Sequence, residues 1–467
     1  MTDRELPPKR GARAVRISLL LFGALLIAYA LSDNSFYGGE PGFGGTQALI
    51  AVIGAAVALC ALLPVDIGGR ILLLTVTGLV ALGVTEIAGE VFLGPRYRPV
   101  YQYDARLIFK LIPNRRSVMT RLQVNGGQTV VQHINSEGYR GGELLPPGTA
   151  SRVVVYGDSF IHAYYSPAKE TFVNQLGAML GKRLGRRFEV VNAGVSSYGP
   201  DQELVKMEEE LPGLRPALVI VAVYAGNDYG DLMRNKMFRL DASGGLVRNH
   251  WRLDPKVRML LQLGQRESIL KRAARSIYER FKGQEGGHAI DMDFLLHESE
   301  REYRDYIVDH DNVVTNIYVD YYSANISLEP NSPSSRYEIA LMRQVMRRMR
   351  DVAARDHVPL IFLFIPHASD VTSRYDNWRV DRNRYPEYDG RNQIAPLENA
   401  ARDLGVPFVS LYDVFRARDA NLLYFHGGND HWNAAGQKLA ARAMAGYLLD
   451  RGFPRWSGDG QARTGAH

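Results

Sequence analysis

Long apolar runs dominate the N-terminal part of the chain. Three of them cover residues 15–32, 47–65 and 71–94, and a polar, glycine-rich segment separates the first two. A helix needs about 17–25 apolar residues to cross a bilayer, so the runs predict a transmembrane region of about three helices over residues 15–94. The alternative is a buried hydrophobic hairpin of a soluble domain. Three such runs in so short a stretch leave little polar surface, which favours the membrane.

Beyond residue 150 the pattern changes to short, continuous apolar runs that alternate with segments of helical periodicity. Such alternation is typical of a parallel sheet covered by helices on both faces. We therefore predict an α/β domain over residues 151–451, with an insertion at 231–336 that caps the edge or mouth of the sheet. The predicted elements are strand 152–157, helix 171–185, strand 188–194, helix 201–211, strand 217–228, helix 337–356, strand 358–366, a strand running into a loop at 406–415, and helix 433–449.

Two shorter segments flank this domain. Residues 95–150 contain alternating runs broken by Asn125-Gly126-Gly127, which predicts a β-rich connector that includes a hairpin. Residues 452–467 are glycine-rich and polar, which predicts a disordered tail.

The charges beside the apolar runs predict the orientation of the chain. Lysine and arginine are frequent in residues 1–14 and absent from the loop between the first two runs. The positive-inside rule makes residues 1–14 a cytoplasmic tail, and three crossings of the cytoplasmic (inner) membrane place the α/β domain on the periplasmic side. If the first run is instead a signal cleaved near Ala28-Tyr29-Ala30, the domain still lies outside. Four basic residues soon after the third run oppose this orientation, namely Arg96, Arg98, Arg106 and Lys110.

Composition and charge argue against several classes of partner and cofactor. Hydrophobic residues make up 46% and charged residues 23% of the chain, as in ordinary globular proteins. The net charge of +6 is spread without basic clusters between aromatic residues, so nucleic acid is not an expected partner. Cys60 is the only cysteine, which excludes a disulfide or a cysteine-based metal site within one chain. We expect no metal and no cofactor, and the sequence leaves the oligomeric state open.

Polar residues follow the predicted strands at the edge where such sheets bind ligands. The first three strands are followed by Gly157-Asp158-Ser159, Asn192-Ala193-Gly194 and Gly226-Asn227-Asp228, and Asn429-Asp430-His431 precedes the last helix. A serine hydroxyl becomes a nucleophile when a base takes its proton, and histidine is suited to that task at neutral pH. The blocks therefore predict acyl transfer, with Ser159 as the nucleophile and His431 as the base.

Acyl transfer also needs fixed hydrogen-bond donors for the negative charge that develops on the carbonyl oxygen. Three groups could supply an oxyanion hole: the backbone N–H of Ser159, the backbone N–H of Gly194 and the side-chain amide of Asn227. Glycine suits position 194 because a side chain there would block the approach of the substrate.

Each block also has an ordinary structural explanation. A lone Gly-Asp-Ser is commonly a strand-to-helix turn, with Asp158 or Ser159 as the N-cap, and Asn433 is expected to cap the last helix. Four blocks in order favour a functional site. Asp158, His162 and Asp228 are then candidate residues of the substrate pocket, with His162 as a wall residue and not as a base.

The blocks GDS, NAG and GND, followed by a late histidine before a helix, resemble the SGNH (GDSL-like) hydrolase superfamily over about residues 150–450. The resemblance implies a flavodoxin-like, three-layer α/β/α sandwich. It also implies the nucleophile at Ser159, an oxyanion hole completed by Gly194 and Asn227, and the base at His431. The phrase INSEGYRG and the apolar N-terminus resemble those of bacterial membrane-anchored members.

The chain departs from the family pattern at the acid of the catalytic triad. The family usually places this acid two or three residues before the histidine, where the chain has Asn429 and Gly428. Asp430, directly before His431, is the candidate acid. The alternative is a Ser–His dyad in which a backbone carbonyl orients the imidazole.

These features together predict a membrane-anchored serine esterase that acts on an acyl ester, an acetyl ester above all, in the cell envelope through an acyl-Ser159 intermediate. The expected partners are an acyl ester or O-acetylated glycan and the lipid bilayer. Two alternatives stay open. One is an O-acyltransferase that modifies an exported polysaccharide with the same groups, and the other is a catalytically silent glycan-binding module.

Overall fold

The computed structural model describes residues 9–32, 44–92, 100–121, 123–263, 270, 291–317, 319–372, 375, 378–427 and 429–453. The chain forms two compact units, one of Met1–Pro95 with Glu267–Phe281 and one of Arg96–Arg266 with Lys282–His467. Most of the predicted tail at 452–467 lies outside the described residues, as do Arg96, Arg98 and Gly428.

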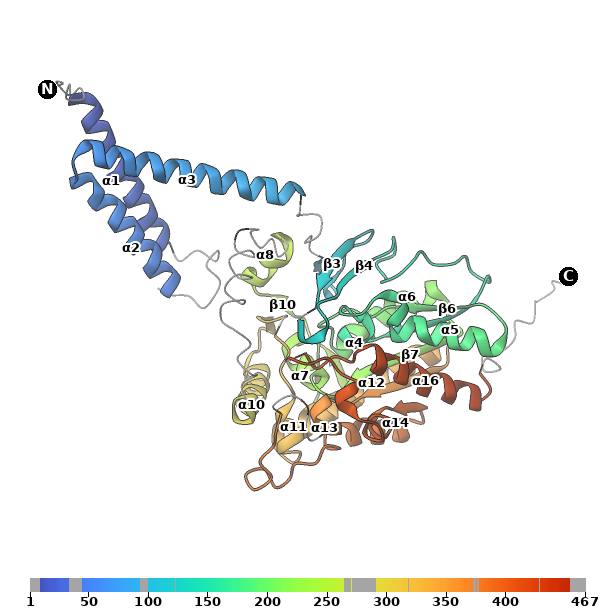
Figure 1. The fold of residues 1–467 in the computed structure, drawn as a ribbon. Helices are drawn as coiled ribbons and strands as arrows, with labels where there is room; N and C mark the ends of the chain where they lie inside the picture. The colour runs from blue at the N-terminus through green and yellow to red at the C-terminus, as the bar shows by residue number, and fades with distance from the viewer. Residues whose placement is uncertain are drawn as a thin grey trace. The chain divides into compact units, whose positions relative to one another are not determined.

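Three helices of the first unit coincide with the three apolar runs (Figure 1). They are α1 (Lys9–Leu31), α2 (Gly45–Leu59), which continues into the short helix η2 (Cys60–Leu62), and α3 (Val65–Phe92). Gly11–Leu31 and Val65–Gly89 are long and apolar enough to cross a membrane, by length and composition, and Gln47–Leu62 is a shorter apolar helix. The backbones of α1 and α2 approach so closely that a Cβ on Gly23 would lie 2.5 Å from the carbonyl oxygen of Gly54. Small residues permit this packing.

The second unit is built on a five-stranded parallel sheet with the order β13-β12-β7-β5-β6. Read from the other edge, the order along the chain is 2-1-3-4-5, which is that of flavodoxin-like folds. The predicted α/β fold with a parallel sheet is confirmed. The strands are β5 (Ser151–Tyr156), β6 (Phe188–Asn192), β7 (Leu218–Tyr224), β12 (Leu360–Ile365) and β13 (Phe408–Ser410).

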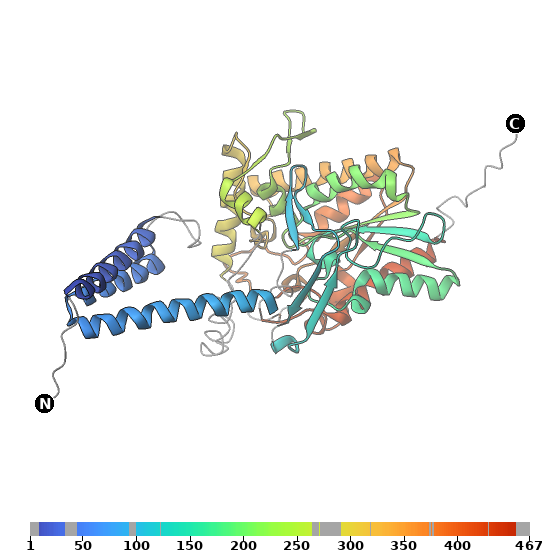
Figure 2. The same cartoon turned by 90° about the horizontal axis from the view of Figure 1, so that it is seen from above.

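Helices cover both faces of this sheet, as Figure 2 shows. One face carries α5 (Phe172–Leu184) packed on α16 (Ala434–Asp450), and the other carries α6 (Pro200–Leu214) packed on α12 (Pro333–Arg355), which α14 (Ile394–Leu404) also contacts. The central strands β7 and β12 are buried along their whole length. Cover on both faces explains why their sequences are continuously apolar.

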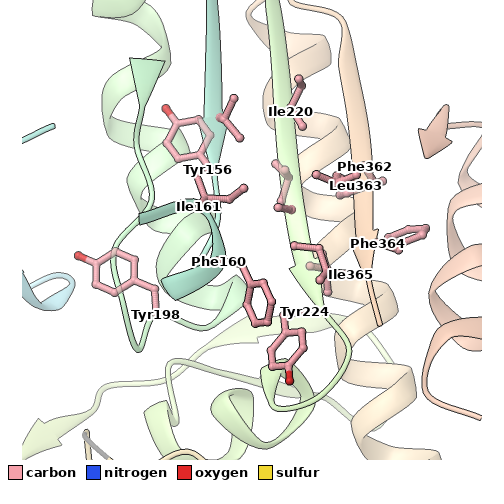
Figure 3. Packing of buried hydrophobic residues seen from close by; sticks show 14 of the residues in the cluster. Tyr156, Phe160, Ile161, Tyr198, Ile220, Tyr224, Phe362, Leu363, Phe364 and Ile365 are labelled. Atoms are coloured by element: carbon pink, nitrogen blue, oxygen red, sulfur yellow. The ribbon is translucent and has the colours of Figure 1, made fainter. Parts of the chain in front are cut away.

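The hydrophobic core continues to the carboxyl end of the sheet (Figure 3). Phe160 and Tyr224 form its last layer there, with ring centroids 4.2 Å apart. Both rings are fully or almost fully buried. The groups that follow β5 and β7 are therefore supported by a close-packed floor.

Two strands end four or more residues earlier than the sequence predicts, and the others differ from their predicted ends by one or two residues. β7 ends at Tyr224, because the carboxylate of Asp228 accepts the Tyr224 backbone N–H at 2.7 Å and the chain turns into α7 (Asp228–Asn235). The stretch 406–415 forms a strand only up to Ser410 and then the short helix α15 (Tyr412–Arg416). A short apolar run fits one buried helical turn as well as a strand, so periodicity alone does not separate them.

The connector and the insertion are built from smaller elements. In the connector β1 (Tyr101–Asp104) pairs with β2 (Ile108–Leu111), and β3 (Arg116–Thr120) pairs with β4 (Thr129–His133), both antiparallel. Gly126 in the predicted hairpin turn has a φ of 86°, which favours glycine. The insertion contains β8 (Phe238–Leu240), β9 (Leu246–Arg248), β10 (Arg252–Leu253), α8 (Pro255–Leu263), α10 (Met292–Val308), β11 (Val313–Val314) and α11 (Ala324–Leu328).

Candidate active site

The turn after β5 presents Ser159 at the carboxyl end of the sheet. Asp158 is the N-cap of the short helix α4 (Ser159–His162), and its carboxylate accepts the Phe160 backbone N–H at 2.9 Å. The turn requires glycine at position 157, because a Cβ there would lie 2.4 Å from Cγ1 of Ile161. The local sequence thus holds the serine beside the point between β5 and β7 where flavodoxin-like sheets bind ligands.

The segment before α16 brings His431 to the same place. Its Nε2 lies 2.7 Å from the hydroxyl oxygen of Ser159. The imidazole stacks on Phe160, with ring centroids 4.9 Å apart, and Trp432 donates its indole N–H to the Phe160 carbonyl oxygen at 3.1 Å. Core packing therefore holds together two residues that are 272 positions apart in the sequence.

Two side chains contact the other nitrogen of the His431 imidazole. Oδ1 of Asn429 lies 2.9 Å from Nδ1 and also accepts the His431 backbone N–H at 3.2 Å. Oδ1 of Asp430 lies 3.3 Å from Nδ1. Two acceptors at Nδ1 favour the tautomer that carries its proton there and leaves Nε2 free to take one from Ser159. The imidazole is thus oriented by side chains and not by the backbone carbonyl of the dyad alternative.

Asp430 supplies negative charge beside this imidazole. It accepts a hydrogen bond from the hydroxyl of Tyr224, and its Oδ2 lies 3.6 Å from Nε2 of His367. Burial raises the pKa of Asp430, but its contacts with His431, His367 and Tyr224 outweigh burial and lower that pKa well below its ordinary value. Burial lowers the pKa of His431, but Asp430 and more distant carboxylates outweigh it and raise that pKa. The ionised carboxylate therefore favours the imidazolium that forms when His431 takes a proton.

Asn227 and Gly194 are the two predicted oxyanion donors outside α4, and they differ in whether the donor group already has a hydrogen-bond acceptor. Asn227 is the N-cap residue of α7 and lines the cavity, and its side-chain amide forms no hydrogen bond with another described residue. Gly194 donates its backbone N–H to Oδ1 of Asn192 at 3.1 Å. A Cβ at position 194 would lie 2.5 Å from the His162 backbone nitrogen, so glycine is needed there to pack against α4 and not to admit substrate. Among the described residues, the side-chain amide of Asn227 therefore fits the predicted donor role better than the Gly194 N–H does.

A cavity of about 400 Å³ opens over Ser159, His431 and Asn227. Aromatic rings and two carboxylates make up much of its wall, which suits a substrate with both apolar faces and hydroxyl groups. In the described part of the chain, no group of three or more His, Cys, Asp or Glu side chains is placed to hold a metal ion. The other lining residues are Tyr224, Gly226, Leu295, Asp320, Tyr321, Tyr322, His367, Tyr375, Trp378 and Asp430.

Three of these lining residues, His367, Tyr322 and Trp378, form an aromatic cluster outside the set of predicted site residues. The His367 ring lies 4.6 Å from that of Tyr322 and 4.5 Å from that of Trp378, between centroids. His367 follows β12 at the carboxyl edge, so the rule that found Ser159 and Asn227 also marks it. Tyr322 and Trp378 lie in segments without periodicity, and no sequence signal places them here.

The structure corrects the predicted pocket residues Asp158, His162 and Asp228, none of which lines the cavity. Asp158 caps α4 and Asp228 accepts the Tyr224 N–H, so both carboxylates stabilise turns behind the cavity wall. His162 is fully buried, and its Nδ1 lies 2.8 Å from the hydroxyl of Ser196. Burial, and then the charge of Arg140, lower the pKa of His162 to about 3, so it is neutral at physiological pH.

A buried arginine from the connector holds the other end of α4. The Arg140 guanidinium donates to the carbonyl oxygens of Ala163 and Ser166, at 2.5 Å each, and to that of His162. Burial lowers the pKa of Arg140 to about 10, so the group stays charged at neutral pH. These carbonyls follow the last turn of α4, where Ala163 has a φ of 52°. Arg140 is therefore a positioning residue for the helix that begins with Ser159.

Replacing Arg140 by methionine removes the donor to the carbonyl oxygens of His162 and Ser166, whereas the carbonyl oxygen of Ala163 still accepts the Ser166 backbone N–H at 2.9 Å. We expect the free energy of unfolding to fall by about 2 kcal/mol or more, because each unpaired group costs on the order of 1 kcal/mol or more. We also expect kcat for p-nitrophenyl acetate to fall about tenfold with little change in KM, because Ser159 loses its alignment. Thermal unfolding and steady-state kinetics of the full chain in detergent measure the two effects.

The control is Arg116→Met at an exposed position of β3, which we expect to change the free energy of unfolding by less than about 0.5 kcal/mol. An Arg140→Met chain that loses stability as expected but keeps its full kcat would show that the alignment of Ser159 does not depend on this arginine.

No family model and no curated protein matches the sequence. Solved structures do match. The lipase/acylhydrolase from Enterococcus faecalis has a TM-score of 0.31 at 12% identity and covers 64% of this chain and 96% of its own. The acetylxylan esterase Axe2 from Geobacillus stearothermophilus has a TM-score of 0.34 at 12% identity, with 67% and 98% covered. A GDSL-like lipase from Bacteroides thetaiotaomicron has a TM-score of 0.29 at 12% identity, with 66% and 93% covered.

Proposed function

We propose that this protein is an SGNH-type serine esterase of the cell envelope. The observation that carries the proposal is the 2.7 Å contact between Oγ of Ser159 and Nε2 of His431, beside the unbonded amide of Asn227 in one cavity. A serine whose hydroxyl contacts an imidazole, with acceptors on the other imidazole nitrogen, has the geometry that activates a nucleophile.

The reaction follows from these positions. Oγ of Ser159 attacks the ester carbonyl carbon, and its proton passes to Nε2 of His431. The carbonyl oxygen becomes an oxyanion, which the amide of Asn227 and the backbone N–H of Ser159 stabilise. The imidazolium returns the proton to the leaving alkoxide as the carbon–oxygen bond breaks and the acyl-Ser159 ester forms. Water, with its proton taken by His431, then hydrolyses that ester and restores the serine.

An acetyl ester of an envelope glycan fits the cavity. Its volume of about 400 Å³ leaves room for a short acyl group beside a sugar, and the half-buried rings of Tyr321 and Trp378 in its wall offer faces for the sugar. The same aromatic wall supports a second candidate function, O-acyl transfer, because it could hold a sugar hydroxyl where water otherwise attacks the acyl-serine.

The helices of the N-terminal unit support an envelope location. We propose that α1, α2 and η2, and α3 cross the inner membrane, with residues 1–14 in the cytoplasm and the catalytic unit in the periplasm. The apolar lengths of Gly11–Leu31 and Val65–Gly89 support two of these crossings.

A fluorophosphonate probe tests the nucleophile and its location together. We expect a membrane-impermeant probe to label the full chain in intact spheroplasts at Ser159, and Ser159→Ala to abolish labelling. The matched control, Ser243→Ala, removes an exposed hydroxyl from the β8–β9 turn and should label like the wild type. Labelling that persists in Ser159→Ala would overturn the nucleophile, and labelling only after lysis would reverse the topology.

Product analysis separates the remaining alternatives. With an acetyl ester and a glycan acceptor, free acetate alone indicates an esterase, and an acetylated glycan indicates a transferase. A wild-type chain that neither labels nor turns over between about pH 6 and about pH 9 would favour the silent glycan-binding module, because a histidine base is normally active within that range.

A further inference from the structure

A second cavity lies beside the first and shares a wall with it. It measures about 650 Å³, and Trp378 lines both cavities. Tyr322, which lines the first cavity, donates its hydroxyl to Oδ1 of Asp370, which lines the second, at 2.8 Å. A polymer whose reacting unit occupies the first cavity can therefore place a neighbouring unit in the second.

Unpaired guanidinium groups distinguish the second cavity. Two other arginines of the same region, Arg384 and Arg391, are paired with Asp293 at 2.8 Å and with Asp413 at 3.0 Å. The arginines that line the cavity form no ion pair with any described carboxylate, so their donors are available to a ligand. They are Arg379, Arg382, Arg416 and Arg418.

The carboxyl groups that line this cavity form no ion pair with its arginines and are fewer than them. Oδ1 of Asp389 accepts the Arg391 backbone N–H at 2.8 Å, and Oδ1 of Asp419 accepts the Asn421 backbone N–H at 3.2 Å. Burial raises the pKa of Asp370 to about 7, so much of this group is uncharged at neutral pH. Four cations against two or three anions leave the cavity with a positive potential.

Aromatic rings hold two of the arginines in place. The guanidinium of Arg382 lies 5.4 Å from the centre of the Tyr388 ring, and that of Arg416 lies 6.0 Å from the centre of the Tyr412 ring. Stacking leaves the N–H edges of a guanidinium free, and two such N–H groups match the two oxygens of a carboxylate. Aromatic faces beside carboxylate-binding forks suit a sugar ring that carries an acid group.

We infer that the second cavity binds a carboxylate-bearing sugar unit of the polymer whose ester reacts at Ser159, so that the substrate is an acidic, uronate-containing glycan. This assignment rests on the proposed function for the reaction itself. The binding that it describes does not depend on the reaction and can be measured without it.

Calorimetric titration of the full chain carrying Ser159→Ala, in a neutral detergent, measures this binding. The probes are unacetylated tetragalacturonate and neutral xylotetraose. We expect tetragalacturonate to bind more tightly, and Arg379→Gln with Arg382→Gln to weaken it about tenfold or more, whereas the xylotetraose affinity should not change. Raising NaCl from about 0.05 M to about 0.5 M should weaken the binding of tetragalacturonate and leave the binding of xylotetraose unchanged.

The matched control removes the same charge elsewhere. Arg343→Gln with Arg350→Gln changes one exposed and one half-buried arginine of α12, which pair with Asp403 and Asp351. We expect this variant to bind tetragalacturonate within about twofold of its parent. Equal affinity in the cavity variant and its parent, or tighter binding of xylotetraose than of tetragalacturonate, would overturn the inference.

Kinetics separate failure of the inference from failure of the proposed function. In the active chain, the double change at Arg379 and Arg382 should raise KM for O-acetylated polygalacturonate and leave p-nitrophenyl acetate hydrolysis unaffected. Tight tetragalacturonate binding by a chain that hydrolyses neither ester would overturn the proposed reaction and keep the binding site. Hydrolysis of both esters with equal KM in the variant and the wild type would overturn the binding site alone.

Discussion

Replacing His431 by alanine is expected to lower kcat/KM for p-nitrophenyl acetate by about 10⁴-fold or more, because Ser159 then has no base to take its proton. Neither neighbouring histidine can substitute. Nδ1 of His162 contacts Ser196 behind the cavity wall, and Nε2 of His367 faces Asp430. Steady-state hydrolysis by the full chain in detergent measures the loss.

A double variant tests whether His431 and Ser159 act as a unit. The chain carrying both alanine substitutions should be no slower, within about threefold, than either single variant, since a concerted pair loses its effect at the first deletion. His250→Ala is the control, because it removes an exposed imidazole from the loop between β9 and β10. Losses that multiply in the double variant would mean that the two residues work separately.

Asp430→Asn is expected to have the second large effect, on both the height and the position of the pH–rate profile. The carboxylate stabilises the imidazolium from 3.3 Å away, and charge at such a distance is worth about 4 kcal/mol near a protein surface, so the plateau should fall about 10²–10³-fold. His431 must be neutral to take a proton, so the rate rises with pH through its pKa. Asp430 raises that pKa, and its loss should move the rise to lower pH.

Asn429→Ala separates orientation from charge. It removes the 2.9 Å contact on Nδ1 but leaves the carboxylate, so we expect about a tenfold lower plateau and an unmoved acid limb. Asp311→Asn, an exposed carboxylate paired with Arg252, is the control for loss of one negative charge. If Asn429→Ala moved the acid limb and Asp430→Asn did not, the Asn429 amide and not the Asp430 carboxylate would control the pKa of His431. The assignment of Asp430 as the acid would then be wrong.

Much of the second unit follows from local sequence. The continuous apolar runs of β7 and β12 predict buried parallel strands because cover on both faces leaves no polar side to the strand. The turn at Gly157 and the cap at Asn433 are likewise local, since each depends on groups within four residues along the chain. The carboxyl ends of parallel strands share one edge, which is why Ser159 and Asn227 could be assigned to a common site before any coordinates.

The partner of the imidazole could not be assigned in this way. Asn429 and Asp430 are adjacent, and which oxygen reaches Nδ1 depends on how the loop packs against Tyr224 and Phe160. The pocket residues Asp158, His162 and Asp228 were misassigned for a related reason. A residue next to a nucleophile in sequence can point behind the turn that presents it, where it caps a helix or a strand end.

The periodicity and turn residues of the chain were thus sufficient to predict the order of strands and helices and the apolar runs of membrane length. They were also sufficient to mark the blocks that contain Ser159, His431 and Asn227 as candidate site residues. Three features depend on the tertiary structure alone. Asn429 and Asp430 both contact Nδ1 of His431, and Gly194 packs against α4. Trp378 lies between the cavity over Ser159 and a second cavity, whose arginines have no ion-pair partner among the described residues. Backbone preferences act over a few residues and leave their mark in the local pattern. Contacts between side chains from distant segments depend on packing, which no local pattern records.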